Sequence, residues 1–101
     1  MTNRLPNIHP GEVLREDFLI PLGMTPYRLA KGLGMTPSAV KEILDGKRGI
    51  TALTALRLSR FFGTTPQLWM NLQASYDLEE AQLREGDKLA AVEPYPMPHA
   101  A

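Results

Sequence analysis

The sequence predicts an all-α fold of five helices, of which the last is the longest. Threonine followed by proline opens a predicted helix three times, at Thr25–Pro26, Thr36–Pro37 and Thr65–Pro66. The threonine hydroxyl accepts a free backbone N–H of the first turn, and proline lacks the N–H that would go unpaired there. Gly34 and Gly63 follow two of the predicted helices, and glycine readily adopts the positive φ that ends a helix.

Apolar spacing and these end signals set the expected helix boundaries. The first helix should stop at Pro21 and Gly23, and Gly86 should weaken the last helix before a short helical stretch at 88–92. The five helices are expected at 10–19, 26–33, 37–44, 51–62 and 65–84.

The stretch from Met24 to Arg48 has the pattern of a helix-turn-helix. Ala30 is small where two helices should cross, Gly34 lies in the turn, and Val40 and Ile43 lie one turn apart on the second helix. Two helices that cross steeply after a short turn need this combination. The alternative is a plain helical hairpin inside a small all-α domain.

The polar side of the second of these helices is the candidate DNA-reading surface. If Val40 and Ile43 face inward, the outward side is left to five residues, and in DNA-binding versions of the motif the start of this helix enters the major groove. Those residues are Thr36, Ser38, Ala39, Lys41 and Glu42.

Charge is unevenly distributed along a chain whose formal net charge is zero. Residues 25–60 hold seven basic and two acidic side chains, a balance of +5, whereas residues 61–101 hold two basic and six acidic ones, a balance of −4. The basic segment coincides with the helix-turn-helix, so an anionic partner such as DNA is expected there. Lys47 and Arg48, at the tip of a glycine-flanked turn, are candidate phosphate contacts, and Thr51 can offer its hydroxyl. Arg57 and Arg60 are expected to be solvated.

Several classes of function find no support in the sequence. The chain of 101 residues fits one domain, has no cysteine and has no apolar run long enough for a membrane span. It shows no Gly-rich phosphate loop, no Ser/His/Asp set and no metal-ligand spacing. We therefore expect a cytoplasmic protein that is not an enzyme and that has no cofactor, metal or small-molecule substrate. His9 is expected to be a helix cap or a surface residue.

The domain organisation should be simple. We expect a flexible N-terminal arm at 1–8, a helix-turn-helix domain at 9–85 that includes a dimerisation helix at 65–85, and a weakly ordered Pro-rich tail at 86–101. Part of the wide apolar side around Trp69 exceeds what one small bundle can bury. Trp69 and Leu72 are expected to complete the core, and the apolar face around Leu72, Tyr76 and Leu83 is expected to lie at or near the two-fold axis of a homodimer.

The succession of motifs resembles the HigA-type antitoxins, short members of the Xre/Cro-like helix-turn-helix group related to the VapI-type regulators. The resemblance covers most of the chain. It rests on IHPGEVLREDFL (Ile8–Leu19), PLGMT (Pro21–Thr25), ILDGKRGIT (Ile43–Thr51) and ALRLSRFFGTTPQLWMNLQASYDL (Ala55–Leu78).

The resemblance implies a five-helix, lambda-repressor-like domain with a longer C-terminal helix. It implies a dimer that represses its own operon by reading an inverted repeat in double-stranded DNA, and that neutralises a RelE-like, HigB-type mRNA endonuclease toxin. The recognition helix would be 36–44, with the phosphate contacts on nearby residues. Those contacts would be Thr25, Lys47, Arg48 and Thr51, with Tyr27 and Arg28 as supplements.

The sequence leaves alternatives open. A free-standing helix-turn-helix repressor with no cognate toxin would carry the same motifs. A purely protein-binding helical module would share the fold but would not retard DNA.

Overall fold

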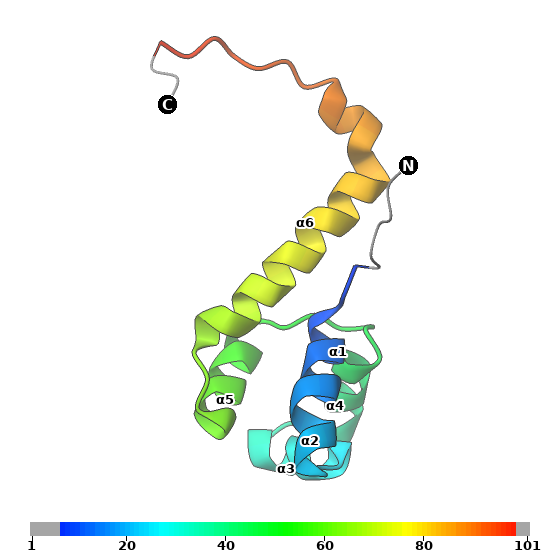
Figure 1. Cartoon of the computed structure of the whole chain (residues 1–101), viewed down its shortest axis with the longest axis vertical. Helices are drawn as coiled ribbons and strands as arrows, with labels where there is room; N and C mark the ends of the chain where they lie inside the picture. Colours follow the sequence, from blue (N-terminus) through cyan, green and yellow to red (C-terminus); the bar gives the residue numbers. More distant parts are fainter. Residues whose placement is uncertain (1–6, 99–101) are drawn as a thin grey trace.

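The fold is all-α throughout residues 7–98, the part of the chain that the structure, a computed structural model, describes. The predicted arm at 1–8 and the end of the predicted tail, including His99, therefore lie largely outside the described residues. Helices α3 and α4 lie at one end of the molecule, and the second half of the long helix α6 projects from the other (Figure 1). The overall extents are 52 × 33 × 22 Å.

The first helical stretch is longer than predicted. It runs without a break through α1 (Pro10–Val13), the π-helical segment η1 (Leu14–Leu19) and α2 (Ile20–Leu22). The prediction that Pro21 ends the helix was wrong. In the widened π-helical turn the Ile20 N–H donates to the carbonyl five residues back, and proline then follows with no N–H of its own to satisfy. Gly23, at φ +61°, ends the stretch.

The next three helices follow their sequence signals closely. They are α3 (Pro26–Leu33), α4 (Pro37–Leu44) and α5 (Ala52–Phe62). Gly34 and Gly63 adopt the left-handed conformation after α3 and α5, as predicted. Helix α3 packs on α4 and on α5, and α1 packs on α4 and α6.

Helix α6 (Pro66–Ala90) is bipartite. Glu85, directly before Gly86, has non-helical backbone angles (φ −119°, ψ 21°) and marks a kink. The predicted weakening at Gly86 is therefore confirmed. The first half of α6 packs on α5, and the second half and residues 91–98 extend away from the body (Figure 1).

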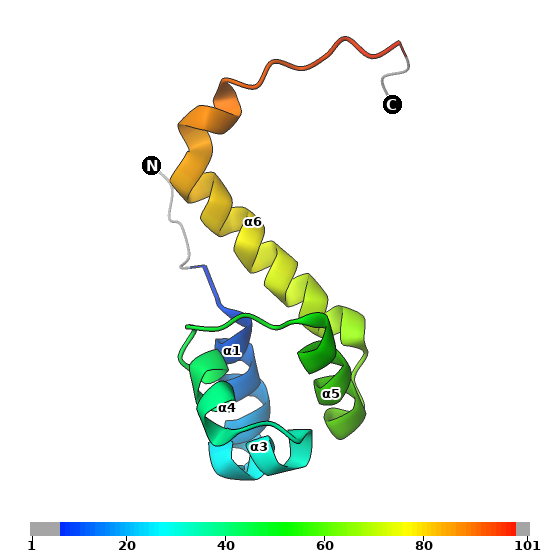
Figure 2. The same cartoon turned by 180° about the vertical axis from the view of Figure 1, so that it is seen from behind.

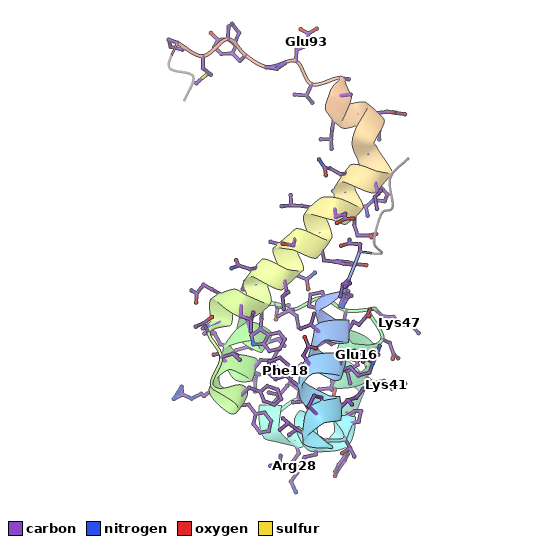
Figure 3. All side chains as sticks on the ribbon, viewed as in Figure 1. Glu16, Phe18, Arg28, Lys41, Lys47 and Glu93 are labelled. Atoms are coloured by element: carbon purple, nitrogen blue, oxygen red, sulfur yellow. The ribbon has the colours of Figure 1, made fainter. Side chains whose placement is uncertain are left out.

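Aromatic packing closes the core between the first helical stretch, α5 and α6. Trp69 is fully buried, and its indole N–H donates to the Thr64 hydroxyl at 2.8 Å. The Phe18 ring lies 4.8 Å from that of Phe62 and 5.1 Å from that of Trp69, centroid to centroid. Figure 3 shows Phe18 pointing from the first helical stretch toward α5. This contact holds α5 and α6 against the first helical stretch.

Candidate nucleic-acid interface

Hydroxyl caps fix both helices of the motif at their N-terminal ends. The Thr25 hydroxyl accepts the Arg28 N–H at 3.1 Å, and the Thr36 hydroxyl accepts the Ala39 N–H at 3.1 Å. Both side chains are exposed. A hydroxyl that accepts one bond still has a hydrogen to donate, so either cap can also donate to a phosphate oxygen.

The turn between α3 and α4 has the geometry that the crossing needs. The Met35 N–H donates to the Ala30 carbonyl, and the Gly34 N–H donates to the Lys31 carbonyl, which together form a Schellman motif. Ala30 is buried, and Gly34 has φ +70°. The predicted roles of the small alanine and the turn glycine are confirmed.

Helix α4 has one buried and one exposed side, as predicted. Val40, Ile43 and Leu44 are buried in the core. The opposite side is polar and accessible, and the Lys41 side chain keeps 75% of its surface exposed. Of the five predicted base contacts, Ala39 is half-buried and the other four are exposed: Thr36, Ser38, Lys41 and Glu42.

Exposed ion pairs link this side of α4 to the following loop. The Lys41 ammonium lies 3.3 Å from an Asp45 carboxylate oxygen, and the Arg48 guanidinium lies 2.8 Å from a Glu42 carboxylate oxygen. Such solvated pairs contribute at most about 1 kcal/mol each, so a phosphate can replace the carboxylate at little cost. Within residues 7–98 no acidic side chain pairs with Lys47. Lys41 and Lys47 point to the same side of the molecule (Figure 3).

The remaining predicted phosphate contacts lie at helix starts. Tyr27 is 68% exposed at the start of α3. Arg28 projects from the end of the molecule in Figure 3, and its guanidinium carbon lies 5.6 Å from the Phe61 ring centroid. The exposed Thr51 hydroxyl accepts the Thr54 N–H at 3.3 Å and so caps α5.

Two arginines that sequence reasoning did not place cap the C-terminal ends of the motif's helices. An Arg15 guanidinium N–H donates to the Leu44 carbonyl at 3.0 Å, at the end of α4. An Arg57 guanidinium N–H donates to the Leu33 carbonyl at 2.7 Å, at the end of α3. The negative end of the helix dipole stabilises a cation at this position. The expectation that Arg57 is merely solvated was wrong, because it satisfies a carbonyl that the end of α3 leaves free.

His9 caps the first helix, which confirms one of its two expected roles. Its Nδ1 accepts the Gly11 N–H at 2.9 Å, and its ring meets the Tyr76 ring edge-on at 4.8 Å. Burial lowers the pKa of His9 below 6.5, and the nearby Asp77 carboxylate opposes part of this shift. The accepting nitrogen must be unprotonated, so the cap requires neutral His9.

The three residues predicted at a dimer axis differ in how much of the side chain is exposed. Leu72 packs against the core, and Tyr76 is half-buried beside His9. Leu83 keeps 56% of its surface exposed. Only Leu83 thus offers most of its side chain to a second copy.

The described residues hold neither a membrane-spanning helix nor a metal-binding cluster. None of the helices between residues 7 and 98 has the length and apolar character needed to cross a membrane. In the same part of the chain, no group of three His, Cys, Asp or Glu side chains lies close enough to hold a metal ion.

Comparison with known proteins connects this geometry to a family. Residues 14–69 match the helix-turn-helix family, which covers more than half of the chain. The virulence-associated protein I of Dichelobacter nodosus is 52% identical over 80 residues, which are 79% of this chain and 74% of that protein.

Solved structures agree with this assignment. The Pseudomonas aeruginosa antitoxin HigA, solved with the higBA promoter, is 41% identical, with a TM-score of 0.85 over 88% of this chain and 98% of that one. A HigA-family addiction module antidote protein from Coxiella burnetii is 47% identical, with a TM-score of 0.85 over 90% of this chain and all of that one. The chain belongs to the Xre-like helix-turn-helix proteins, in the family of the HigA-type antitoxins.

Proposed function

We propose that the protein is an antitoxin that represses its own operon by binding operator DNA as a dimer and that neutralises a HigB-type toxin. The observation that carries the DNA-binding part is the two-sided α4. Its apolar side is buried, and its polar side stands exposed beside the cationic Lys47 loop. A relative of the same fold at 41% identity, the Pseudomonas aeruginosa antitoxin HigA, was solved with the higBA promoter.

The proposed contacts divide into two kinds. The residues that would face base edges in the major groove lie at the start and along the outward side of α4: Thr36, Ser38, Ala39, Lys41 and Glu42. A second set, at the starts of α3 and α5 and in the loop after α4, would meet the sugar-phosphate backbone, which positions the protein without reading sequence. This set is Thr25, Tyr27, Arg28, Lys47, Arg48 and Thr51.

A dimer is proposed because one recognition helix reads only a few base pairs. Two symmetric copies double the site and place the half-sites about one helical turn, roughly 34–36 Å, apart. Leu72, Tyr76 and Leu83 on α6 remain the proposed contacts. Leu83 is the most exposed of the three and is the best position for a test by substitution with a charged residue.

Gel retardation tests the DNA-binding proposal. The probe is the DNA directly upstream of the gene, and the control is a shuffled duplex of equal length and composition. The proposal expects the upstream fragment to be retarded at protein concentrations that leave the control free. Equal retardation of both fragments would show binding without recognition, and no retardation would leave a protein-binding helical module.

Co-expression with the neighbouring gene tests the antitoxin proposal. The product of that gene carries an affinity tag, and this chain should be recovered with it and should relieve its toxicity. A neighbour that neither binds this chain nor arrests growth would favour the alternative, a free-standing repressor with no cognate toxin. The two assays are independent, so one half of the proposal can fail without the other.

A further inference from the structure

A side chain of α6 bonds the backbone directly after the loop that carries Lys47 and Arg48. The Gln73 side-chain oxygen accepts the Ile50 N–H at 2.6 Å. Ile50 is buried and directly follows the loop. Figure 2 shows the connection from α4 to α5 crossing the start of α1 toward the base of α6. Gln73 is therefore positioned to set where this connection lies.

A second residue of α6 fixes the orientation of the Gln73 amide. The amide N–H of Gln73 donates to an Asp77 carboxylate oxygen at 2.9 Å, one helical turn further on. A carboxylate only accepts, so it selects the NH₂ end of the amide. The oxygen end is then directed at Ile50. Asp77 thus acts on the loop through Gln73, and its carboxylate also lies near His9.

Side chains from other segments lie beside the loop at both of its ends, tightly at Gly49 and at ordinary contact distance at Gly46. A Cβ added to Gly49 would lie 3.0 Å from the Gln73 side-chain oxygen, so the backbone there rests directly against the amide. At the other end, a Cβ added to Gly46 would lie 3.7 Å from the His9 ring. Between these two supports, the side chains of Lys47 and Arg48 remain exposed.

We propose that Gln73, oriented by Asp77, is a positioning residue that holds the Lys47–Arg48 loop in the conformation that meets the DNA backbone. This inference rests on the proposed operator binding. Gln73 itself is half-buried beneath the loop and does not touch DNA. A loop ordered before binding loses less conformational entropy on the DNA, so its phosphate contacts contribute more to affinity.

The decisive test variant exchanges the amide and the carboxylate between positions 73 and 77, so its net charge equals that of the wild type. Gln73→Ala removes the acceptor for Ile50. Gln73→Glu keeps an acceptor but places a second carboxylate beside Asp77. The double variant Gln73→Glu with Asp77→Asn again pairs an acceptor for Ile50 with an amide donor at position 77. Gln82→Ala, which changes an exposed glutamine on the same helix, is the matched control.

Each variant is titrated with the labelled upstream duplex at several salt concentrations, at a temperature where circular dichroism shows it folded. Gln73→Ala should weaken binding about tenfold and reduce the salt dependence, because the loop's phosphate contacts are lost. Gln73→Glu should also bind weakly, the double variant should recover most of the affinity and the salt slope, and Gln82→Ala should match the wild type.

Three distinguishable results would overturn the inference. If the wild type binds the duplex and a folded Gln73→Ala shows the same affinity and salt slope, Gln73 has only a structural role and the proposed function stands. If the double variant is folded but as weak as Gln73→Glu alone, the amide geometry does not position the loop. A wild type that fails to bind the duplex would remove the proposed function, and this inference with it.

Discussion

Replacing Gly11 with alanine tests how closely the first helix must approach α4. An alanine Cβ at this position would lie 1.8 Å from the Ile43 carbonyl oxygen and 2.7 Å from its carbonyl carbon. Real Cβ contacts essentially never fall below 3.0 Å, so the two backbones would have to separate by about 1.2 Å. Both obstructing atoms belong to backbone, so no side chain can rotate away.

The expected cost follows from this geometry. Overpacking a well-filled core costs about 1–3 kcal/mol, and a clash with helix backbone belongs at the upper end of that range. The separation would also draw Arg15 away from the Leu44 carbonyl that it caps. We expect Gly11→Ala to lower the free energy of unfolding by about 3 kcal/mol.

Urea denaturation followed by Trp69 fluorescence measures the change. Gly86→Ala is the matched control, because a Cβ there meets nothing within 4 Å and its φ is not positive. That control should be neutral or stabilising by up to about 1 kcal/mol, since alanine favours helix over glycine. A Gly11→Ala protein within about 0.5 kcal/mol of the wild type would refute the close approach of these helices.

Three further predictions concern the interface and its supports. Lys47→Ala with Arg48→Ala should reduce the slope of log K against log salt by about 1.8, since each phosphate contact contributes about 0.9; an unchanged slope would exclude the loop from the interface. Arg57→Met, which keeps an apolar stem, should cost about 1–2 kcal/mol in urea denaturation, because the Leu33 carbonyl loses a charged donor; an unchanged midpoint would mean that water replaces the bond. His9→Asn should flatten the fall in stability as the pH drops below about 6.5, because the folded-state pKa of His9 lies below its unfolded value and the unfolded chain binds the proton first. Stability curves of the two proteins that stay parallel from pH 7 to pH 5 would contradict this role of His9.

Local signals account for the parts of the fold that the sequence predicted well. Each Thr-Pro pair and each helix-ending glycine acts within about four residues, so its effect does not depend on the rest of the chain. The buried side of α4 was equally predictable, because Val40 and Ile43 share one side of any regular helix. Pro21 misled because the π-helical turn before it relieves the usual conflict of proline with a helix.

The supports of the interface depend on contacts between distant parts of the chain. Arg15, Arg57 and Gln73 each bond a backbone group 23 or more residues away. Their partners are ordinary carbonyl or N–H groups, which carry no signature in the sequence. Such bonds form only once the helices are packed, so the sequence could predict a candidate interface but not the bonds that support it.

The central claim is that the exposed side of α4 reads bases. It is tested most directly by measuring how well a Lys41→Ala protein distinguishes operator DNA from random DNA. Anisotropy titrations measure both dissociation constants, with Lys88→Ala on the projecting half of α6 as the control for loss of one exposed positive charge. We predict that Lys41→Ala loses about 1–3 kcal/mol on the operator and much less on random DNA, while Lys88→Ala changes neither. Equal losses on both duplexes for Lys41→Ala would place this lysine on phosphate alone, and no loss on either would contradict the orientation of α4 toward DNA.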